Sequence, residues 1–276
     1  MARAVTVEQI LDEAARLAED HEGTRLVACF DADGTLWSGD LGEAAFDHAH
    51  LHDVVDEDTV RGPIARFLAD YDLGIVDDGP RTVERTLALV SAALLDGRFE
   101  EAGARRGRAR DETLADVYMM QTWCYAGRTL DALRAYGQRV FDDHIARTVF
   151  AHTRPLLHGL ADRGFALAVV TASPFFLVEH AVSSLCPPGT RLLGMSTAVD
   201  DGRVLPRAGT CVYGPGKARA IARAFGEGAP ALAFGDTVAG GDREMLRAAR
   251  LPVAVRPKGA HRAAADAWDT LLLLES

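Results

Sequence analysis

Short apolar runs alternate with amphipathic segments along most of this 276-residue chain. Four runs are nearly unbroken in apolarity and are typical of strands buried on both faces of a sheet. They are residues 25–31 (RLVACFD), 166–171 (ALAVVT), 231–235 (ALAFG) and 252–255 (PVAV). Helical spacing predicts helices over 155–163, 174–185, 216–226 and 242–249. This alternation predicts an α/β fold, with a Rossmann-like parallel sheet and helices on both of its faces.

The segment from about residue 41 to 150 has a different pattern. It contains no convincing strand, and five amphipathic stretches predict helices. They are LGEAAFDHAHLH, RGPIARFLADY, RTVERTLALVSAALL, DETLADVYMMQTWCY and TLDALRAYGQRVFDDHI. We therefore expect an α-helical cap domain, residues 41–149, inserted into a core domain of residues 1–40 and 150–276.

Two local signals add detail to the core. Thr6 and Gln9 have the spacing of a capping box at the start of an N-terminal helix. Asp201-Gly202, within VDDGRVLP at 199–206, predicts the turn of a hairpin.

Composition narrows the class of protein. A net charge of −10 does not favour nucleic-acid binding, and the basic run RRGRAR at 105–110 is more typical of a solvated loop or helix face. The four cysteines are widely spaced, as in reduced thiols, and no apolar run is long enough to span a bilayer. The N-terminus lacks the apolar core of a signal peptide. We expect a cytoplasmic protein; the sequence leaves its oligomeric state open.

Polar residues follow the predicted strands where a parallel sheet binds its ligands. Asp31 and Asp33 end the first strand, Thr171 ends the second, and Asp236 and Asp242 follow the third. Lys217 stands at the start of a predicted helix. Clustered carboxylates favour a hard cation such as Mg²⁺, and a lysine, a hydroxyl and a helix start suit phosphate oxygens.

Each of these residues has a simpler interpretation when taken alone. Thr171 and Asp242 are common at helix starts, and Lys217 could be a surface lysine. The DxDG run also occurs in calcium loops, but an EF-hand has its glycine at position six, whereas Gly34 stands at position four.

As an ordered set, DADGT, the strand ending at Thr171, Lys217 and GDTVAGGD resemble the four motifs of the haloacid dehalogenase (HAD) superfamily of phosphohydrolases. The early helical insertion resembles the C1 cap class, which includes phosphoserine phosphatases. FDADGTLW and MMQTWCYAGRT resemble phosphorylcholine-phosphatase-type members. One departure is that Asp236 and Asp242 are six residues apart, whereas the family usually has four or five.

The resemblance implies a mechanism. Asp31 would be the nucleophile that forms an aspartyl-phosphate, and Asp33 the general acid and base. Thr171 and Lys217 would bind the phosphoryl group. Mg²⁺ would be held by Asp31, the backbone carbonyl of Asp33 and Asp236, with Asp242 in the outer shell.

The substrate is then expected to be a small phosphorylated metabolite. Phosphoserine phosphatases have an acid near the position of Asp40, where it binds the substrate's amino group. With Glu43, Trp37 and Trp123, and with Tyr118 and Tyr125 in the cap, Asp40 could bind an ammonium head group such as that of phosphocholine or phosphoethanolamine. Otherwise Asp40 caps a helix beginning near Leu41 and the aromatic residues pack the core. The remaining alternatives are a phosphoserine-type phosphatase, a phosphotransferase or mutase on the same scaffold, and a metal-dependent binding module without activity.

Overall fold

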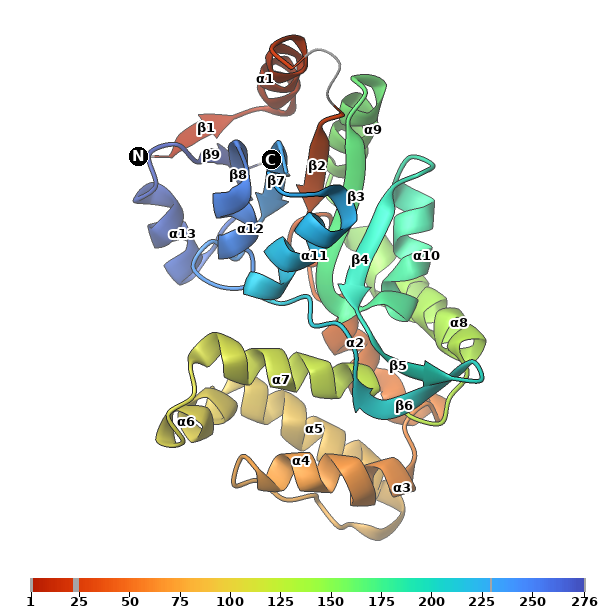
Figure 1. The fold of residues 1–276 in the computed structure, drawn as a ribbon. Helices are drawn as coiled ribbons and strands as arrows, with labels where there is room; N and C mark the ends of the chain where they lie inside the picture. Colours follow the sequence, from red (N-terminus) through yellow and green to blue (C-terminus); the bar gives the residue numbers. More distant parts are fainter. Residues whose placement is uncertain (1, 22–24, 229, 276) are drawn as a thin grey trace.

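The computed structural model describes residues 2–21, 25–228 and 230–275, and within them seven strands form one parallel sheet in the order β1-β9-β8-β7-β2-β3-β4 (Figure 1). A separate antiparallel hairpin is formed by β5 and β6. The strand bounds are β1 Arg3–Val5, β2 Val27–Phe30, β3 Ala166–Pro174, β4 Arg191–Met195, β5 Thr197–Asp200, β6 Arg203–Ala208, β7 Leu232–Gly235, β8 Leu251–Val255 and β9 Leu272–Leu274. Because β2 lies between β3 and β7, the three strands expected to carry the site residues are neighbours.

Alternate residues of the central strands face opposite sides of the sheet, and each side has its own apolar core. Phe30 of β2 and Phe234 of β7 stack on one side, with ring centroids 4.2 Å apart. Cys29 and Ala233 belong to the core on the other side. Strands covered on both faces need apolar residues at every position, which explains the unbroken runs in the sequence.

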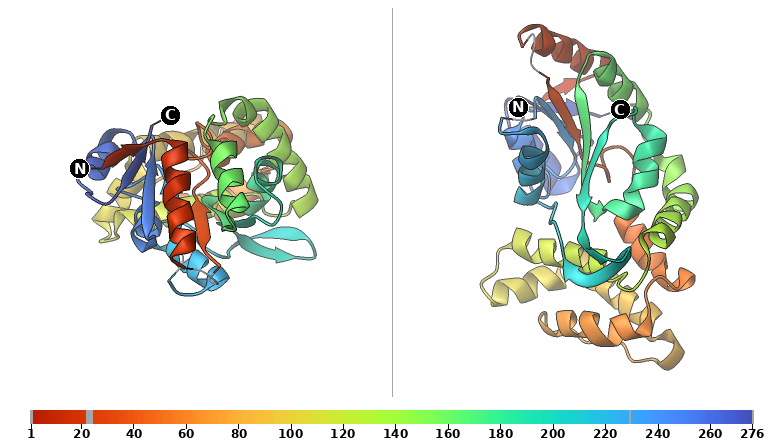
Figure 2. Two further views of the ribbon diagram at one scale, coloured as in Figure 1. Left: turned by 90° about the horizontal axis from the view of Figure 1, so that it is seen from above. Right: turned by 45° about the vertical axis from the view of Figure 1, so that its right-hand side comes forward.

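Helices cover both faces of this sheet (Figure 2). Helices α1, α9 and α10 contribute to the core that contains Phe30, and α11, α12 and α13 to the core that contains Cys29. Their bounds are α1 Val7–Glu19, α9 Thr153–Asp162, α10 Phe175–Leu185, α11 Pro215–Phe225, α12 Arg243–Ala248 and α13 Gly259–Asp266. The expected capping box of Thr6 and Gln9 is present at the start of α1.

The chain between β2 and β3 is a helical insert, as predicted. Figure 1 shows α3 to α7 below the carboxyl ends of the strands. The α-helices are α2 Leu41–His48, α3 Glu57–Thr59, α4 Ala65–Ala69, α5 Thr82–Leu95, α6 Arg98–Arg105, α7 Arg110–Trp123 and α8 Leu130–Val140. Short 3₁₀ or π segments are η1 Ala49–His52, η2 Val60–Ile64, η3 Gly79–Arg81, η4 Phe141–Ile145 and η5 Ala146–Thr148.

Helix α8 and the loop before it fasten the insert to the core. Helix α8 packs directly on α10, where Gly137 lies so close to Leu177 that an added Cβ would come within 2.6 Å of the Leu177 backbone. The loop before α8 pairs with the hairpin: Gly127 donates its backbone N–H to the carbonyl of Val204 at 2.8 Å, and Leu130 donates to Gly202 at 3.0 Å. The hairpin itself confirms the turn predicted at Asp201-Gly202.

Some predictions about the elements were incomplete. The sequence did not predict the strands β1, β4 and β9, or the helices α6 and α13. Pro174, expected at the first position of a helix, instead ends β3 and caps α10. No helix in the described part of the chain is long and apolar enough to cross a membrane.

Candidate active site

Asp31 lies at the carboxyl end of β2, at the base of the site. Its backbone N–H donates to the carbonyl of Phe234 at 2.8 Å, which fixes it against β7. Its Oδ1 accepts a hydrogen bond from Nζ of Lys217, and its Oδ2 accepts one from Thr35 Oγ1 at 3.3 Å. Burial, reinforced by the charge of Asp242, raises the pKa of Asp31 well above its usual value. The structure therefore holds a buried carboxylate beside a buried cation.

Lys217 joins Asp31 to Asp242. Its Nζ donates to Asp242 Oδ1 at 2.6 Å, and the side chain is almost fully buried. Burial alone would lower the pKa of Lys217, but the charges of Asp242 and Asp31 outweigh it and raise the pKa. A lysine in this position remains charged and can neutralise an anion bound next to Asp31.

Both carboxylate oxygens of Asp242 are occupied. Besides the bond from Lys217, Asp242 Oδ2 accepts hydrogen bonds from Thr237 Oγ1 at 2.7 Å and from the Thr237 backbone N–H at 3.0 Å. Burial would raise the pKa of Asp242, but Lys217 and Thr237 lower it below its usual value. Asp242 occupies the residue before α12 without making a side-chain capping bond, so its role lies with Lys217 and Thr237.

Asp236 differs from Asp242, because no other residue in the described chain donates a hydrogen bond to its carboxylate. Burial, followed by the charge of Asp242, raises the pKa of Asp236 to about 7. Oxygens of Asp31, Asp236 and Asp242 all lie within 4.8 Å of one another. Three carboxylates this close, one of them lacking a partner, are the donor set that Mg²⁺ prefers.

Gly34 allows this cluster to form. Its φ of +75° is in the left-handed region, and a Cβ at this position would lie 2.6 Å from Cγ of Asp236. Only glycine adopts this conformation readily and also leaves room for the Asp236 side chain. The glycine of the DADGT run is therefore explained by its contact with Asp236.

The carboxylate of Asp33 turns away from the cluster and toward three donors. Oδ1 accepts from Trp37 Nε1 at 2.8 Å and from the Leu41 backbone N–H at 2.7 Å, and Oδ2 accepts from Ser173 Oγ at 2.7 Å. The carboxylate therefore does not join the oxygen cluster of Asp31, Asp236 and Asp242. Metal binding through the backbone carbonyl of Asp33 stays a prediction.

Thr171 is buried at the end of the regular part of β3. Its hydroxyl accepts a hydrogen bond from the Ser173 backbone N–H at 3.0 Å and lies 3.5 Å from Oδ2 of Asp33. Together with Asp31 and Lys217 it lines a cavity of about 280 Å³ at this edge of the sheet. The expected phosphate-binding residues and the expected nucleophile thus share one cavity.

The cap side of the cavity contains part of the expected substrate set. Asp40 and Glu43 line it, and so does Tyr118 of α7. Asp40 also caps α2, because its Oδ1 accepts a hydrogen bond from the Glu43 backbone N–H at 2.8 Å. Burial, with the charge of Asp33, raises the pKa of Asp40, and burial raises that of Glu43.

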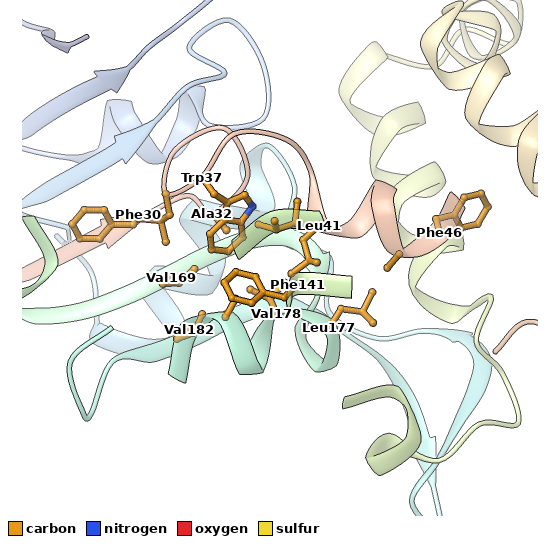
Figure 3. Close-up of a cluster of buried hydrophobic side chains, with 14 of the residues drawn as sticks. Phe30, Ala32, Trp37, Leu41, Phe46, Phe141, Val169, Leu177, Val178 and Val182 are labelled. Atoms are coloured by element: carbon orange, nitrogen blue, oxygen red, sulfur yellow. The ribbon is translucent and has the colours of Figure 1, made fainter. Parts of the chain in front are cut away.

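The structure corrects the prediction for the other aromatic residues. Trp37 is fully buried and packs edge-on to Phe141, with ring centroids 5.9 Å apart (Figure 3), so it cannot contact a substrate. Trp123 lies outside the cavity lining and packs against Phe67 of the cap. Tyr125 is also fully buried. The rings of Trp37 and Tyr125 are packed inside the protein, and the half-buried ring of Trp123 packs within the cap.

Sequence reasoning missed several residues of the cavity. The predicted site does not include Ser173, although the Ser173 hydroxyl donates a hydrogen bond to Asp33. Tyr213 lines the cavity, with its ring centroid 5.1 Å from that of Tyr118, and Gln121 and Lys258 line it as well. Ser173 could have been found, because it follows Thr171 by two residues at the same strand end. No local signal marks Gln121, Tyr213 or Lys258.

Arginines of the basic run at 105–110 form ion pairs with acidic residues of the same chain. Arg105 and Arg106 form ion pairs with Asp72, and Arg108 pairs with Asp116. These contacts support the interpretation as a solvated face of the cap and give no basis for an anionic partner.

Comparison with known proteins identifies relatives of this arrangement. A family model described as haloacid dehalogenase-like hydrolase matches residues 28–247. No curated protein sequence matches the chain. Among solved structures, a protein with unknown function from Bordetella pertussis Tohama I is 19% identical with a TM-score of 0.63, over 91% of this chain and 99% of its own.

Two further solved structures carry names. A substrate-bound phosphoserine phosphatase complex is 17% identical with a TM-score of 0.51, over 92% of this chain and 95% of its own. A probable phosphoserine phosphatase from Vibrio cholerae, in an unliganded form, is 14% identical with a TM-score of 0.52, over 90% of this chain and 60% of its own. At these identities the likeness establishes a common fold.

Proposed function

The chain belongs to the haloacid dehalogenase-like hydrolases, and from this premise we propose that it is a magnesium-dependent phosphomonoesterase for a small phosphorylated metabolite. The observation that supports this most directly is the buried Asp31 carboxylate, paired with Lys217 and facing a cavity of about 280 Å³. A cavity of this size suits a small molecule.

Four residues of the cavity act on the phosphoryl group or on the leaving alcohol in this reaction. Asp31 attacks phosphorus and forms an aspartyl-phosphate, while Lys217 and Thr171 bind the phosphoryl oxygens. Asp33 gives a proton to the leaving alcohol and then takes one from the water that hydrolyses the intermediate. The insert lies over the strand ends and limits the access of bulk water.

Mg²⁺ fits the carboxylate cluster. Asp236 would hold it directly, because no other residue of the described chain donates a hydrogen bond to its carboxylate. Asp31 would hold it through Oδ2, which accepts only a long hydrogen bond of 3.3 Å from Thr35 among the described residues, whereas both oxygens of Asp242 accept hydrogen bonds of 2.6–3.0 Å from Lys217 and Thr237. When bound, the cation neutralises the negative charge that develops on the phosphoryl group.

The first experiment is phosphate release from a panel of phosphorylated metabolites and an aryl phosphate, with and without Mg²⁺. We expect EDTA to abolish release and Mg²⁺ to restore it. Asp31→Asn should be inactive but folded, while the exposed Asp162→Asn serves as a matched control with normal activity. Asp31→Asn turning over at the wild-type rate would contradict the covalent mechanism.

The same assay separates the alternatives. Transfer of the phosphoryl group to an added alcohol, in place of water, would identify a phosphotransferase. Absence of release from every substrate, together with retained Mg²⁺ binding, would support a binding module without activity.

We further propose that the leaving group carries an ammonium head. Asp40 and Glu43 place two carboxylates on the cap side of the cavity, and the rings of Tyr118 and Tyr213 lie beside them. No arginine of the described chain lines the cavity, so a substrate carboxylate would find only lysines as cationic partners. This favours phosphocholine or phosphoethanolamine over phosphoserine.

Glu43→Gln tests this preference. Among the described residues, the Glu43 side chain has no hydrogen-bond or ion-pair partner, and only its backbone N–H bonds to Asp40. The change therefore removes charge without disturbing the cap of α2, whereas Asp40→Asn would affect both. An ion pair worth about 0.2–1 kcal/mol corresponds to a loss of about 1.4- to 5-fold in kcat/KM for the cationic substrate. An uncharged alkyl phosphate of similar size should be unaffected. Equal kcat/KM for both substrates in the wild type would refute the ammonium site.

A further inference from the structure

The carboxylate of Asp33 is held at both oxygens by donors from three parts of the chain. Trp37 lies in the loop after β2, Leu41 begins α2, and Ser173 lies in β3. All three hydrogen bonds are 2.7–2.8 Å long. A carboxylate that accepts hydrogen bonds from three directions has a single orientation.

The two oxygens of Asp33 have different kinds of partner. Those of Oδ1, the indole N–H of Trp37 and the backbone N–H of Leu41, can only donate. The partner of Oδ2, the hydroxyl of Ser173, can donate or accept. A proton on Oδ1 would point toward two groups that can only donate hydrogen bonds. A proton on Oδ2 can be donated to the Ser173 hydroxyl, once that hydroxyl has rotated to accept it.

The two oxygens also differ in their position relative to the cavity. Ser173 and Thr171, the neighbours of Oδ2, line the cavity. Trp37 and Leu41, the partners of Oδ1, are fully buried and do not line it. Oδ2 is therefore on the side that a substrate would reach.

The partners are themselves fixed by packing. Trp37 is held against Phe141 within the apolar core shown in Figure 3. Ser173 lies close to α2, since a Cβ added to Gly42 would be 2.7 Å from its Oγ. Neither side chain can turn away from Asp33 without moving its neighbours.

We propose that Trp37 and Ser173 are positioning residues that orient Asp33 so that proton transfer takes place through Oδ2. The inference rests on the proposed phosphomonoesterase function. As Asp31 bonds to phosphorus, the bond from phosphorus to the leaving oxygen breaks, and that oxygen takes the proton from Asp33 Oδ2. In the second step water attacks phosphorus, the bond to Asp31 breaks, and the proton of the water passes to Oδ2.

The alternative is that the indole N–H of Trp37 bonds to Asp33 merely because a buried donor needs a partner. The dependence of the reaction rate on the leaving group distinguishes a positioning role for Trp37 from this alternative. An alkyl alkoxide needs a proton to leave, whereas p-nitrophenolate leaves without one. Loss of positioning should therefore slow the first turnover of an alkyl phosphate much more than that of p-nitrophenyl phosphate.

The experiment measures the rate of leaving-group release in the first turnover, with Mg²⁺ present. Its substrates are p-nitrophenyl phosphate and the alkyl phosphate that the wild type hydrolyses fastest. For Trp37→Phe we expect the alkyl rate to fall by about tenfold or more relative to the aryl rate. Phe141→Leu is the matched control, because it disturbs the same aromatic pair without touching Asp33, and it should change both rates by the same factor.

Ser173→Ala provides a second test that does not depend on the folding of the Trp37 variant. It removes one hydroxyl and should give the same selective loss, whereas Ser184→Ala, on α10, should not. Equal losses for the two substrates in both Trp37→Phe and Ser173→Ala would overturn the positioning role and leave the phosphatase assignment intact. A wild type that releases neither leaving group would contradict the proposed function, and this inference with it.

Discussion

Asp236 and Asp242 show how two carboxylates of one motif acquire different roles. Asp242 is saturated by Lys217 and Thr237, and its pKa is lowered. No other residue in the described part of the chain donates a hydrogen bond to Asp236, and its pKa is raised to about 7. The neighbours of each residue, rather than the residue type, separate the hydrogen-bonded anion from the proposed cation ligand.

This difference predicts the effects of removing each carboxylate. Asp236→Ala should weaken Mg²⁺ binding more than Asp242→Ala does, as measured by metal titration. Asp242→Ala should instead lower the free energy of unfolding of the metal-free protein by about 3–5 kcal/mol, because it leaves Lys217 partly uncompensated in the interior. Stronger loss of Mg²⁺ in Asp242→Ala would reverse our assignment of the direct ligand.

The raised pKa of Asp236 also predicts that the stability of the metal-free protein depends on pH. The pKa of Asp236 rises from 3.8 to about 7 on folding, so the folded state binds its proton more tightly than the unfolded state does. The contribution of Asp236 to the stability of the metal-free protein is therefore intact below about pH 4. It decreases as pH rises toward 7 and is constant above that.

Asp236→Asn should remove this decrease. Urea unfolding of the metal-free wild type and of Asp236→Asn across this range gives the difference directly. Mg²⁺ binding should release a proton below about pH 7 in the wild type, as seen by calorimetry in two buffers of different ionisation enthalpy. A pH-independent difference between the two proteins would show that Asp236 titrates normally.

Among the elements, β2 and the turn that follows it are central to the candidate active site. The strand delivers Asp31 to the site, and the turn at Gly34 then passes directly beneath Asp236 of the neighbouring β7 strand end. The turn thus redirects the chain and also leaves room for the Asp236 side chain in the candidate active site.

Gly34→Ala should be damaging for two reasons. The left-handed conformation costs about 1–2 kcal/mol for a residue with a Cβ, and the added methyl would collide with the Asp236 carboxylate. We expect loss of Mg²⁺ affinity together with a lower free energy of unfolding. Gly79→Ala is the control, because Gly79 also has a positive φ but no atom within 4 Å of its Cβ position, so it should lose stability alone. Normal Mg²⁺ affinity in Gly34→Ala would contradict the proposed contact.

At the scale of the whole molecule, the insert is held in place over the strand ends. Helix α8 packs on α10, and the loop before α8 pairs with the β5–β6 hairpin (Figure 1). At the far end of the cap, the ion pair of Asp111 and Arg243 is 3.7 Å long and partly exposed, so it contributes little. The attachment of the cap therefore depends mainly on α8, on the hairpin and on the buried apolar contacts of α7 with Met195 and Tyr213 of the core.

Gly137→Ala tests this attachment. Alanine favours a helix over glycine by about 1 kcal/mol, but here its methyl group would press on the backbone of Leu177. We expect a net loss of about 1–3 kcal/mol in the free energy of unfolding and a lower kcat/KM, because the cap would shift over the cavity. Gly74→Ala, with open space around it, should be neutral in both measurements. A stabilised Gly137→Ala variant would show that α8 can move away from α10 at no cost.

The sequence alone determined the class of fold and which polar and charged residues lie at the strand ends. Short unbroken apolar runs such as residues 27–30 are typical of strands covered on both sides, and parallel strands bring their carboxyl ends to one edge. The sequence therefore predicts that Asp31, Thr171, Lys217 and Asp236 lie together. The three-residue strands β1 and β9 were not expected, since three residues carry no periodic signal and become strands only by pairing, β1 with β9 and β9 also with β8.

Only the tertiary structure decided where the side chains point. Trp37 was expected to face a substrate, but its ring is buried against Phe141 and its N–H is bonded to Asp33. Tyr213, 95 residues beyond Tyr118 in the chain, was not expected in the cavity at all. Periodicity and motif spacing describe residues close together along the chain, whereas the orientation of a side chain depends on contacts with residues far away in the sequence. The sequence therefore specified the reacting groups, and the packing of distant segments specified the groups that orient and surround them.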